Sequence, residues 1–123
     1  MVSRILVTGS RAWSDRAAVE HALGTALRLF RPMVVVTGGC PTGADRMAEE
    51  WAHRAGVEVE VWPADWAAHG RAAGPLRNGR MVAAGARMAL AFLLPGGQSR
   101  GTEDCVRRAE AAGIPVQRFE ALR

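Results

Sequence analysis

The sequence predicts an α/β fold in which five parallel strands form a sheet between two layers of helices. Short apolar runs alternate along the chain with stretches in which apolar residues recur at helical spacing. Glycine-rich segments follow several of the apolar runs directly, as expected where a strand turns sharply into a helix. Because a helix separates each pair of successive strands, the strands must run parallel through right-handed crossovers.

The first two strand–helix units occupy the first 56 residues. Residues 4–8 form a buried strand, and Ser14 is the expected N-cap of the helix that follows. Residues 33–37 are a second, β-branched strand. Apolar residues at helical spacing then predict a helix over 44–55, and Gly56 suits its C-terminal stop.

The second half of the chain continues the alternation. Residues 57–62 alternate valine with glutamate, which indicates one solvated face and places this strand at a sheet edge. A longer connection, 63–74, leads to Pro75, which suits the first turn of a helix. The remaining elements are expected at 76–84 (helix), 88–94 (strand), 95–101 (glycine-rich loop), 102–112 (helix) and 115–119 (strand).

These elements predict a Rossmann-like three-layer α/β/α sandwich with strand order 3-2-1-4-5. A length of 123 residues suits a single domain over 1–123. In such sheets a ligand binds outside the carboxyl ends of the strands where the winding direction reverses, here between strands one and four. The loops that begin at Gly9, Gly38 and Pro95 therefore become the candidate site.

Composition narrows the classes of function and location. Two cysteines without a Cys-x-x-Cys pair support neither a disulfide framework nor a metal site. The short apolar N-terminus predicts no signal peptide or membrane span, so we expect a cytoplasmic protein without membrane association. The formal charge is +4, and residues 66–102 contain five arginines but no acidic residue, which points to an anionic partner.

Two loops carry the clearest chemistry. Gly9-Ser10-Arg11 follows the first strand, where a tight turn, a hydroxyl and a guanidinium suit a phosphate, although an ordinary strand-to-helix turn fits equally well. The segment 38–45 places three glycines and Asp45 between a strand and a helix, which favours close approach of a ligand to the backbone. Asp45 has two open interpretations: a favourable charge in the first helical turn, or a partner of ligand hydroxyls.

The loop 95–102 and the following segments complete the candidate site. Free amides and the helix dipole at this loop suit an anion, whereas Glu103 and Asp104 fit a role as dipole partners at least as well as one in catalysis. Arg77 is suited to bidentate phosphate binding if it faces the pocket. Among the four tryptophans, Trp13 and Trp66 lie in loops and are the better candidates for stacking.

Several of these segments resemble a bacterial and phage family of the SLOG superfamily, the YspA-like, YpsA-related branch. They are Val7 to Arg11, Gly38 to Asp45, Pro63 to Trp66 continuing through Arg77-Asn78, and Gly101-Thr102. The resemblance implies a nucleotide-binding domain, distantly similar to LOG-type phosphoribohydrolases and to DprA-like proteins. Together with the loops described above, it gives the expected ligand contacts, namely Gly9, Ser10, Arg11, Trp13, Gly38, Gly39, Thr42, Gly43, Asp45, Asp65, Arg71, Arg77, Asn78, Gly96, Gly97, Gly101 and Thr102.

The LOG-type catalytic motifs are only partly present. Arg77 and Met81 match an Arg-Lys-x-x-Met pattern, but Asn78 replaces its lysine. In the second motif, Pro-Gly-Gly-x-Gly-Thr-x-x-Glu, the position of the glutamate is Cys105. An N-glycosidic-bond hydrolase would therefore need another carboxylate, with Glu103, Asp104 or Asp45 as candidates beside Arg77.

Three functions follow from these observations. The first is binding, sensing or processing of a nucleotide or nucleotide-derived phosphorylated ligand, with no metal site and no cofactor other than this nucleotide-type ligand indicated. The second is hydrolysis of nucleoside 5′-monophosphates of the LOG type. Nucleic-acid binding ranks third, because the charge is modest and no aromatic-rich RNA-binding motif is present. A homodimer is a further expectation, since sheet-fold relatives commonly dimerise.

Overall fold

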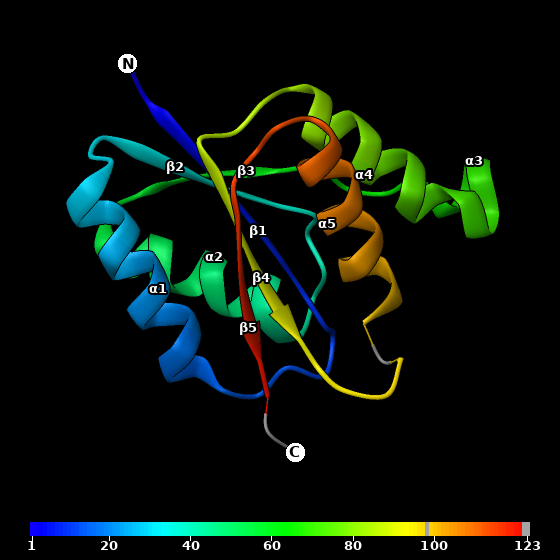
Figure 1. Cartoon of the computed structure of the whole chain (residues 1–123), viewed down its shortest axis with the longest axis horizontal. Coiled ribbons are helices and arrows are strands. Elements are labelled where there is room, and N and C mark those ends of the chain that lie inside the picture. The colour runs from blue at the N-terminus through cyan, green and yellow to red at the C-terminus, as the bar shows by residue number, and fades with distance from the viewer. Residues whose placement is uncertain (98, 122–123) are drawn as a thin grey trace.

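Five parallel strands run in the order β3-β2-β1-β4-β5, which confirms the predicted topology (Figure 1). The computed structural model describes residues 1–97 and 99–121. The strands are β1 (Ser3–Gly9), β2 (Met33–Thr37), β3 (Glu58–Val61), β4 (Met88–Leu93) and β5 (Val116–Glu120). The helices are α1 (Arg16–Leu29), α2 (Gly43–Ala55), α3 (Trp66–His69), α4 (Ala73–Ala83) and α5 (Arg100–Ala111).

Helices cover both faces of the sheet, as expected for an α/β/α sandwich (Figure 1). One face of the central strands packs against α1 and α2, around buried side chains such as Ile5, Val35 and Phe92. The opposite face packs against α4 and α5, around Leu6, Val36 and other buried side chains. Burial on both faces explains why the central strands read as continuous apolar runs in the sequence.

The two edge strands show weaker burial. β3 pairs with β2 at the edge of the sheet and has no buried residue, since Glu58 and Val61 are exposed and Val59 and Glu60 are half-buried. Arg4 of β1 reaches across the sheet to form an ion pair with Glu60 of β3. This pair gives one of the glutamates of the edge strand a defined partner.

Two local details differ from the sequence expectations. The N-cap of α1 is Asp15 rather than Ser14, because the Asp15 carboxylate accepts a hydrogen bond from the Ala18 amide at 3.1 Å. The connection after β3 contains α3 and a 3₁₀ turn (Gly70–Ala72), and α4 begins at Ala73, two residues before Pro75. Pro75 still lies in the first turn of α4, where backbone N–H groups have no acceptor within the helix, so a residue without an N–H loses no hydrogen bond there.

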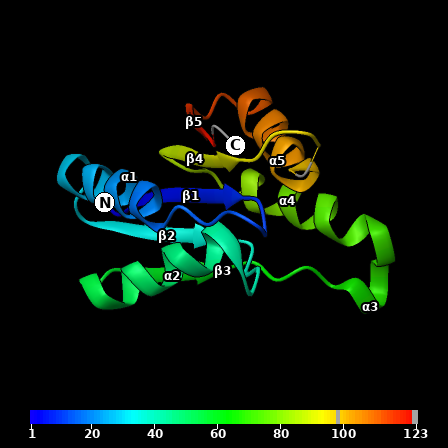
Figure 2. The same ribbon diagram turned by 90° about the horizontal axis from the view of Figure 1, so that it is seen from below.

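The segment that contains α3 projects from the rest of the molecule. Figures 1 and 2 both show α3 at the end of an arm, which is the connection from β3 to α4. An extended segment joins the arm to β3, and α4 joins it to the sheet layer.

In the ranges 1–97 and 99–121, no helix is both long and apolar enough to cross a membrane.

Candidate functional site

A cavity of about 800 Å³ lies at the carboxyl ends of β1, β2 and β4. Its walls come from the loops after these strands, from the arm around Trp66, from α4 and from the first turn of α5. This is the position where the winding direction of the sheet reverses, between β1 and β4. The cavity therefore occupies the place in which ligands of doubly wound sheets bind.

Close backbone contacts fix the two loops that form the floor. Gly43 has φ of 72°, and a Cβ atom there would clash with the backbone oxygen of Ser10. The Thr42 hydroxyl donates a hydrogen bond to the carbonyl of Arg11 at 2.9 Å. A side chain at position 9 would likewise clash with Ala44 of α2. These glycines allow the loops after β1 and β2 to pack directly against one another.

Arg77 crosses from α4 to the loop after β2. Its Nη1 donates to the carbonyl oxygens of Gly38 at 2.6 Å and Trp62 at 3.2 Å, and its Nε donates to Asn78 Oδ1 at 2.8 Å. A Cβ atom at Gly38 would clash with the guanidinium, so the glycine provides the space that Arg77 occupies. These contacts hold a planar cation at the cavity wall and leave Nη2 without a hydrogen bond to the described residues.

Asp45 is the sole carboxylate among the described residues that line the cavity, and its side chain is buried. Oδ2 accepts a hydrogen bond from the Cys40 amide at 3.2 Å, whereas buried Oδ1 has no hydrogen-bond partner in residues 1–97 and 99–121. Burial raises the pKa of Asp45 to about 6, despite the opposing effects of the Cys40 amide and the Arg77 charge. The site therefore contains a carboxyl group that titrates close to neutral pH.

The two other carboxylates considered for catalysis lie outside the cavity wall. Asp104 accepts hydrogen bonds from Asn78 Nδ2 at 3.0 Å and Arg108 Nε at 2.9 Å. Asn78 Nδ2 also donates to the carbonyl of Gly101 at 3.2 Å, which ties α4 to the start of α5. Glu103 forms an ion pair with Arg118 at 3.3 Å. Both acids thus connect elements of the fold.

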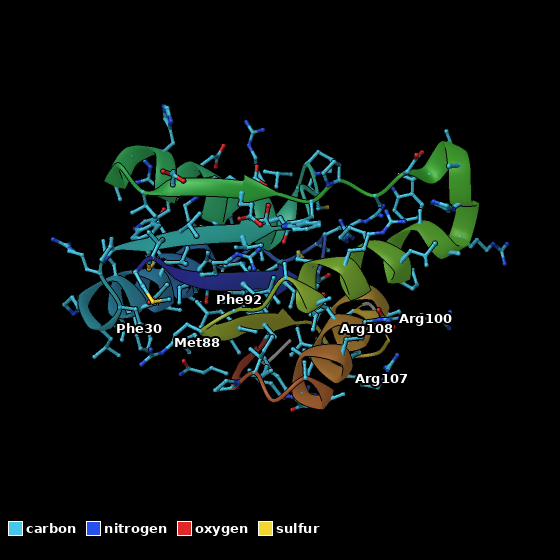
Figure 3. All side chains as sticks on the ribbon, turned by 90° about the horizontal axis from the view of Figure 1, so that it is seen from above. Phe30, Met88, Phe92, Arg100, Arg107 and Arg108 are labelled. Atoms are coloured by element: carbon cyan, nitrogen blue, oxygen red, sulfur yellow. The ribbon has the colours of Figure 1, made fainter. Side chains whose placement is uncertain are left out.

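Three arginines lie along α5. Figure 3 shows Arg100, Arg107 and Arg108 along this helix, on the side opposite Phe30 and Met88. Arg107 and Arg108 pair with Asp104, whereas exposed Arg100 lines the cavity. The cavity thus has three arginines, Arg11, Arg77 and Arg100, in its wall.

The profile of the "YspA, cpYpsA-related SLOG family" matches residues 3–69. The "Gene 61 protein" of Mycobacterium phage D29 is similar to this chain at 47% identity over 121 residues, which cover 94% of this chain and 95% of the phage protein. The chain belongs to the YspA, cpYpsA-related SLOG family. This confirms the family that the glycine-rich segments and the Pro63-Ala64-Asp65-Trp66 segment indicated.

Most of the residues that the sequence singled out for this SLOG chain meet at the cavity. Those in its wall are Gly9, Ser10, Arg11, Gly38, Gly39, Asp45, Arg77, Asn78, Gly97, Gly101 and Thr102. Those outside its wall are Trp13, Thr42, Gly43, Asp65, Arg71, Gly96, Glu103 and Asp104. Trp13 lies in the core, where its indole packs edge-on against Phe92 and donates to the carbonyl of Asp15 at 2.9 Å.

Some wall residues of this family member were missed in the sequence. Cys40 and Pro41 line the cavity within the glycine-rich loop, and Ala64 and Gly74 line it from the arm and α4. The position of Cys40 directly after Gly38-Gly39 was a usable signal, but the arm residues had none before the fold was known. The described ranges hold no group of three or more His, Cys, Asp or Glu side chains suited to a metal ion.

Proposed function

We propose that the cavity binds a nucleotide or nucleotide-derived phosphorylated ligand. The observation that carries the proposal is the fixed guanidinium of Arg77, held by two backbone carbonyls at the wall of a cavity at the switch point of the sheet. Membership in a SLOG family supports a nucleotide-related function. The cavity volume lies within the range of about 300–1,000 Å³ typical of small-molecule sites.

The charges in the cavity wall favour an anion. Arg11 and Arg100 are exposed side chains that form no hydrogen bond or ion pair with the described residues, so their guanidinium groups can reach a phosphate. Gly97 and Gly101 add backbone beside the first turn of α5, whose dipole favours negative charge. One buried carboxylate faces three cations, so the balance in the wall is positive.

Thermal unfolding in the presence of nucleoside mono-, di- and triphosphates, ADP-ribose and NAD tests this proposal. A ligand at about 100 times its Kd stabilises the native state by about 2.7 kcal/mol. We expect a shift with one nucleotide class in the wild type, and its loss or reduction in both Arg77→Ala and Arg100→Ala.

Arg80→Ala is the matched control, since Arg80 is an exposed arginine of α4 that does not line the cavity. Arg100→Ala guards against a folding defect in Arg77→Ala, because Arg100 makes no contact that holds the fold together in the described residues. An unchanged Tm of the wild type with every nucleotide, or equal shifts in all variants, would contradict the proposal.

A second candidate function is hydrolysis of an N-glycosidic bond with Asp45 as the carboxylate. The specific observation in its favour is a buried carboxyl group with a pKa of about 6 in the same wall as Arg77. A carboxylate of this pKa suits general acid–base chemistry near neutral pH. In the reaction, water adds to C1′ of the sugar, the C1′–N bond breaks, and the base leaves with a proton from the water.

Chromatographic detection of free base from nucleoside 5′-monophosphates tests this candidate. Hydrolysis is expected to be lost in Asp45→Asn and retained in Glu103→Gln, since Glu103 lies outside the cavity wall. Absence of base release by a wild-type protein that binds the same nucleotides would rule out hydrolysis and leave binding intact.

A further inference from the structure

Trp66 differs from the other tryptophans in its surroundings. Trp13 is buried in the core, and Trp51 and Trp62 pack against core side chains while half-buried. Trp66 belongs to none of the hydrophobic clusters of the described residues and is 51% exposed. A large indole left in solvent contributes little to folding, so its position calls for another explanation.

The position of Trp66 is defined although its side chain is exposed. Trp66 begins α3, where the Asp65 carboxylate caps the helix by accepting a hydrogen bond from the Ala68 amide at 3.0 Å. The indole lies beside Gly74 of α4, where an added methyl group would be in van der Waals contact with it. The projecting arm therefore presents an aromatic surface to the cavity, of which Trp66 lines the wall.

Arg11 reaches Trp66 from the opposite wall. The guanidinium carbon of Arg11 lies 6.0 Å from the centre of the indole ring, which is the outer limit of a cation–π contact. Thr42 holds the backbone of Arg11 through a hydrogen bond to its carbonyl, whereas the Arg11 side chain is exposed. The contact is weak compared with the stacking of a nucleobase on an indole, so a base can replace it.

We propose that Trp66 is the stacking surface for the aromatic base of the ligand, and that the base replaces Arg11 on the indole and releases its guanidinium to the ligand phosphate. This rests on the proposed function and specifies it: the substrate class is a nucleotide with an intact base rather than a sugar phosphate. Stacking is tolerant of base identity, because every base has a π-face. Purine and pyrimidine nucleotides therefore share the subsite.

The test compares the Kd of AMP, GMP, CMP and UMP with that of ribose 5-phosphate by titration calorimetry. We expect wild type to bind the nucleotides about tenfold or more tightly than ribose 5-phosphate, which is the gain expected from stacking one base. Trp66→Ala removes this preference without weakening ribose 5-phosphate, whereas Trp66→Phe retains most of it. Leu76→Ala is the control, since Leu76 is an exposed apolar residue of α4 outside the cavity wall.

The possible results separate this proposal from the one on which it rests. Equal Kd values of nucleotide and ribose 5-phosphate in the wild type would overturn the stacking role and leave a phosphate site in place. A preference for nucleotides that survives in Trp66→Ala would also overturn it, because the base would then bind elsewhere. Binding of neither probe would overturn the proposed function itself, and the stacking role with it.

Discussion

Replacement of Asp45 by asparagine should make the protein more stable, by an amount that depends on pH. Burial raises the pKa of Asp45 from an ordinary value of 3.8 to about 6, so the folded state holds its proton more tightly than the unfolded state. The contribution of this carboxyl group to stability is therefore fully present below pH 3.8 and is lost as the pH rises through about 6. A difference of roughly two pKa units corresponds to about 3 kcal/mol at neutral pH.

The pH dependence isolates this effect from the other consequences of the substitution. The asparagine Oδ1 can still accept a hydrogen bond from the Cys40 amide. Any free-energy cost of burying the asparagine amino group is the same at every pH. The difference in unfolding free energy between Asp45→Asn and wild type should therefore rise by about 2 kcal/mol between pH 4.5 and pH 8.

Urea unfolding of both proteins in acetate, MES and HEPES buffers of equal ionic strength measures this difference. Phosphate buffer is avoided, because it is a candidate ligand of the cavity. Asp65→Asn is the matched control, since the Asp65 side chain is exposed and free of the burial that acts on Asp45. A difference between Asp45→Asn and wild type that stays constant from pH 4.5 to pH 8 would refute the reasoning.

Two further predictions concern the loops and the thiols. Gly43→Ala should lower the unfolding free energy by about 2 kcal/mol or more in urea titrations, because φ is 72° and the new Cβ clashes with Ser10. Gly24→Ala should raise the unfolding free energy by about 0.5–1 kcal/mol, because Gly24 lies in helix α1 with open space around it and alanine favours a helix. An equal effect of both substitutions would contradict this. At pH 8 a thiol reagent should modify Cys40 rapidly and Cys105 only on unfolding, because Cys105 is buried and burial raises its pKa to about 11. A bound nucleotide should slow the reaction of Cys40, which lines the cavity. Mass spectrometry of labelled peptides measures both reactions.

The fold was accessible from the sequence because its signals are local and repeated. Each central strand is a short apolar run, and each is followed by a helix of clear periodicity, so the alternation determines the parallel topology. The edge position of β3 also followed from its valine–glutamate alternation. By contrast, α3 and the early start of α4 were not predicted, because a four-residue helix on a projecting arm has no periodicity to detect.

The site was only partly accessible, and for a different reason. Residues beside glycines at strand ends were identified, since parallel strands bring those loops together at one edge. Which carboxylate lines the cavity was not decided, because Glu103, Asp104 and Asp45 all lie in the first turn or two of a helix. The packing of α5 against α4, which brings Asp104 to Asn78 and leaves it outside the cavity wall, was not visible in the sequence.

Asn78 shows how one substitution in the motif changes both the fold and the chemistry. The LOG-type pattern has lysine at this position, whereas Asn78 is buried and connects Arg77 to Gly101 and Asp104. A side-chain amide can accept a hydrogen bond from a guanidinium and donate one to a carboxylate at the same time, whereas an ammonium group can only donate. The asparagine thus supports Arg77 at the cavity wall and at the same time engages Asp104, which leaves Asp45, in the first turn of α2, as the carboxylate of the described residues that lines the cavity.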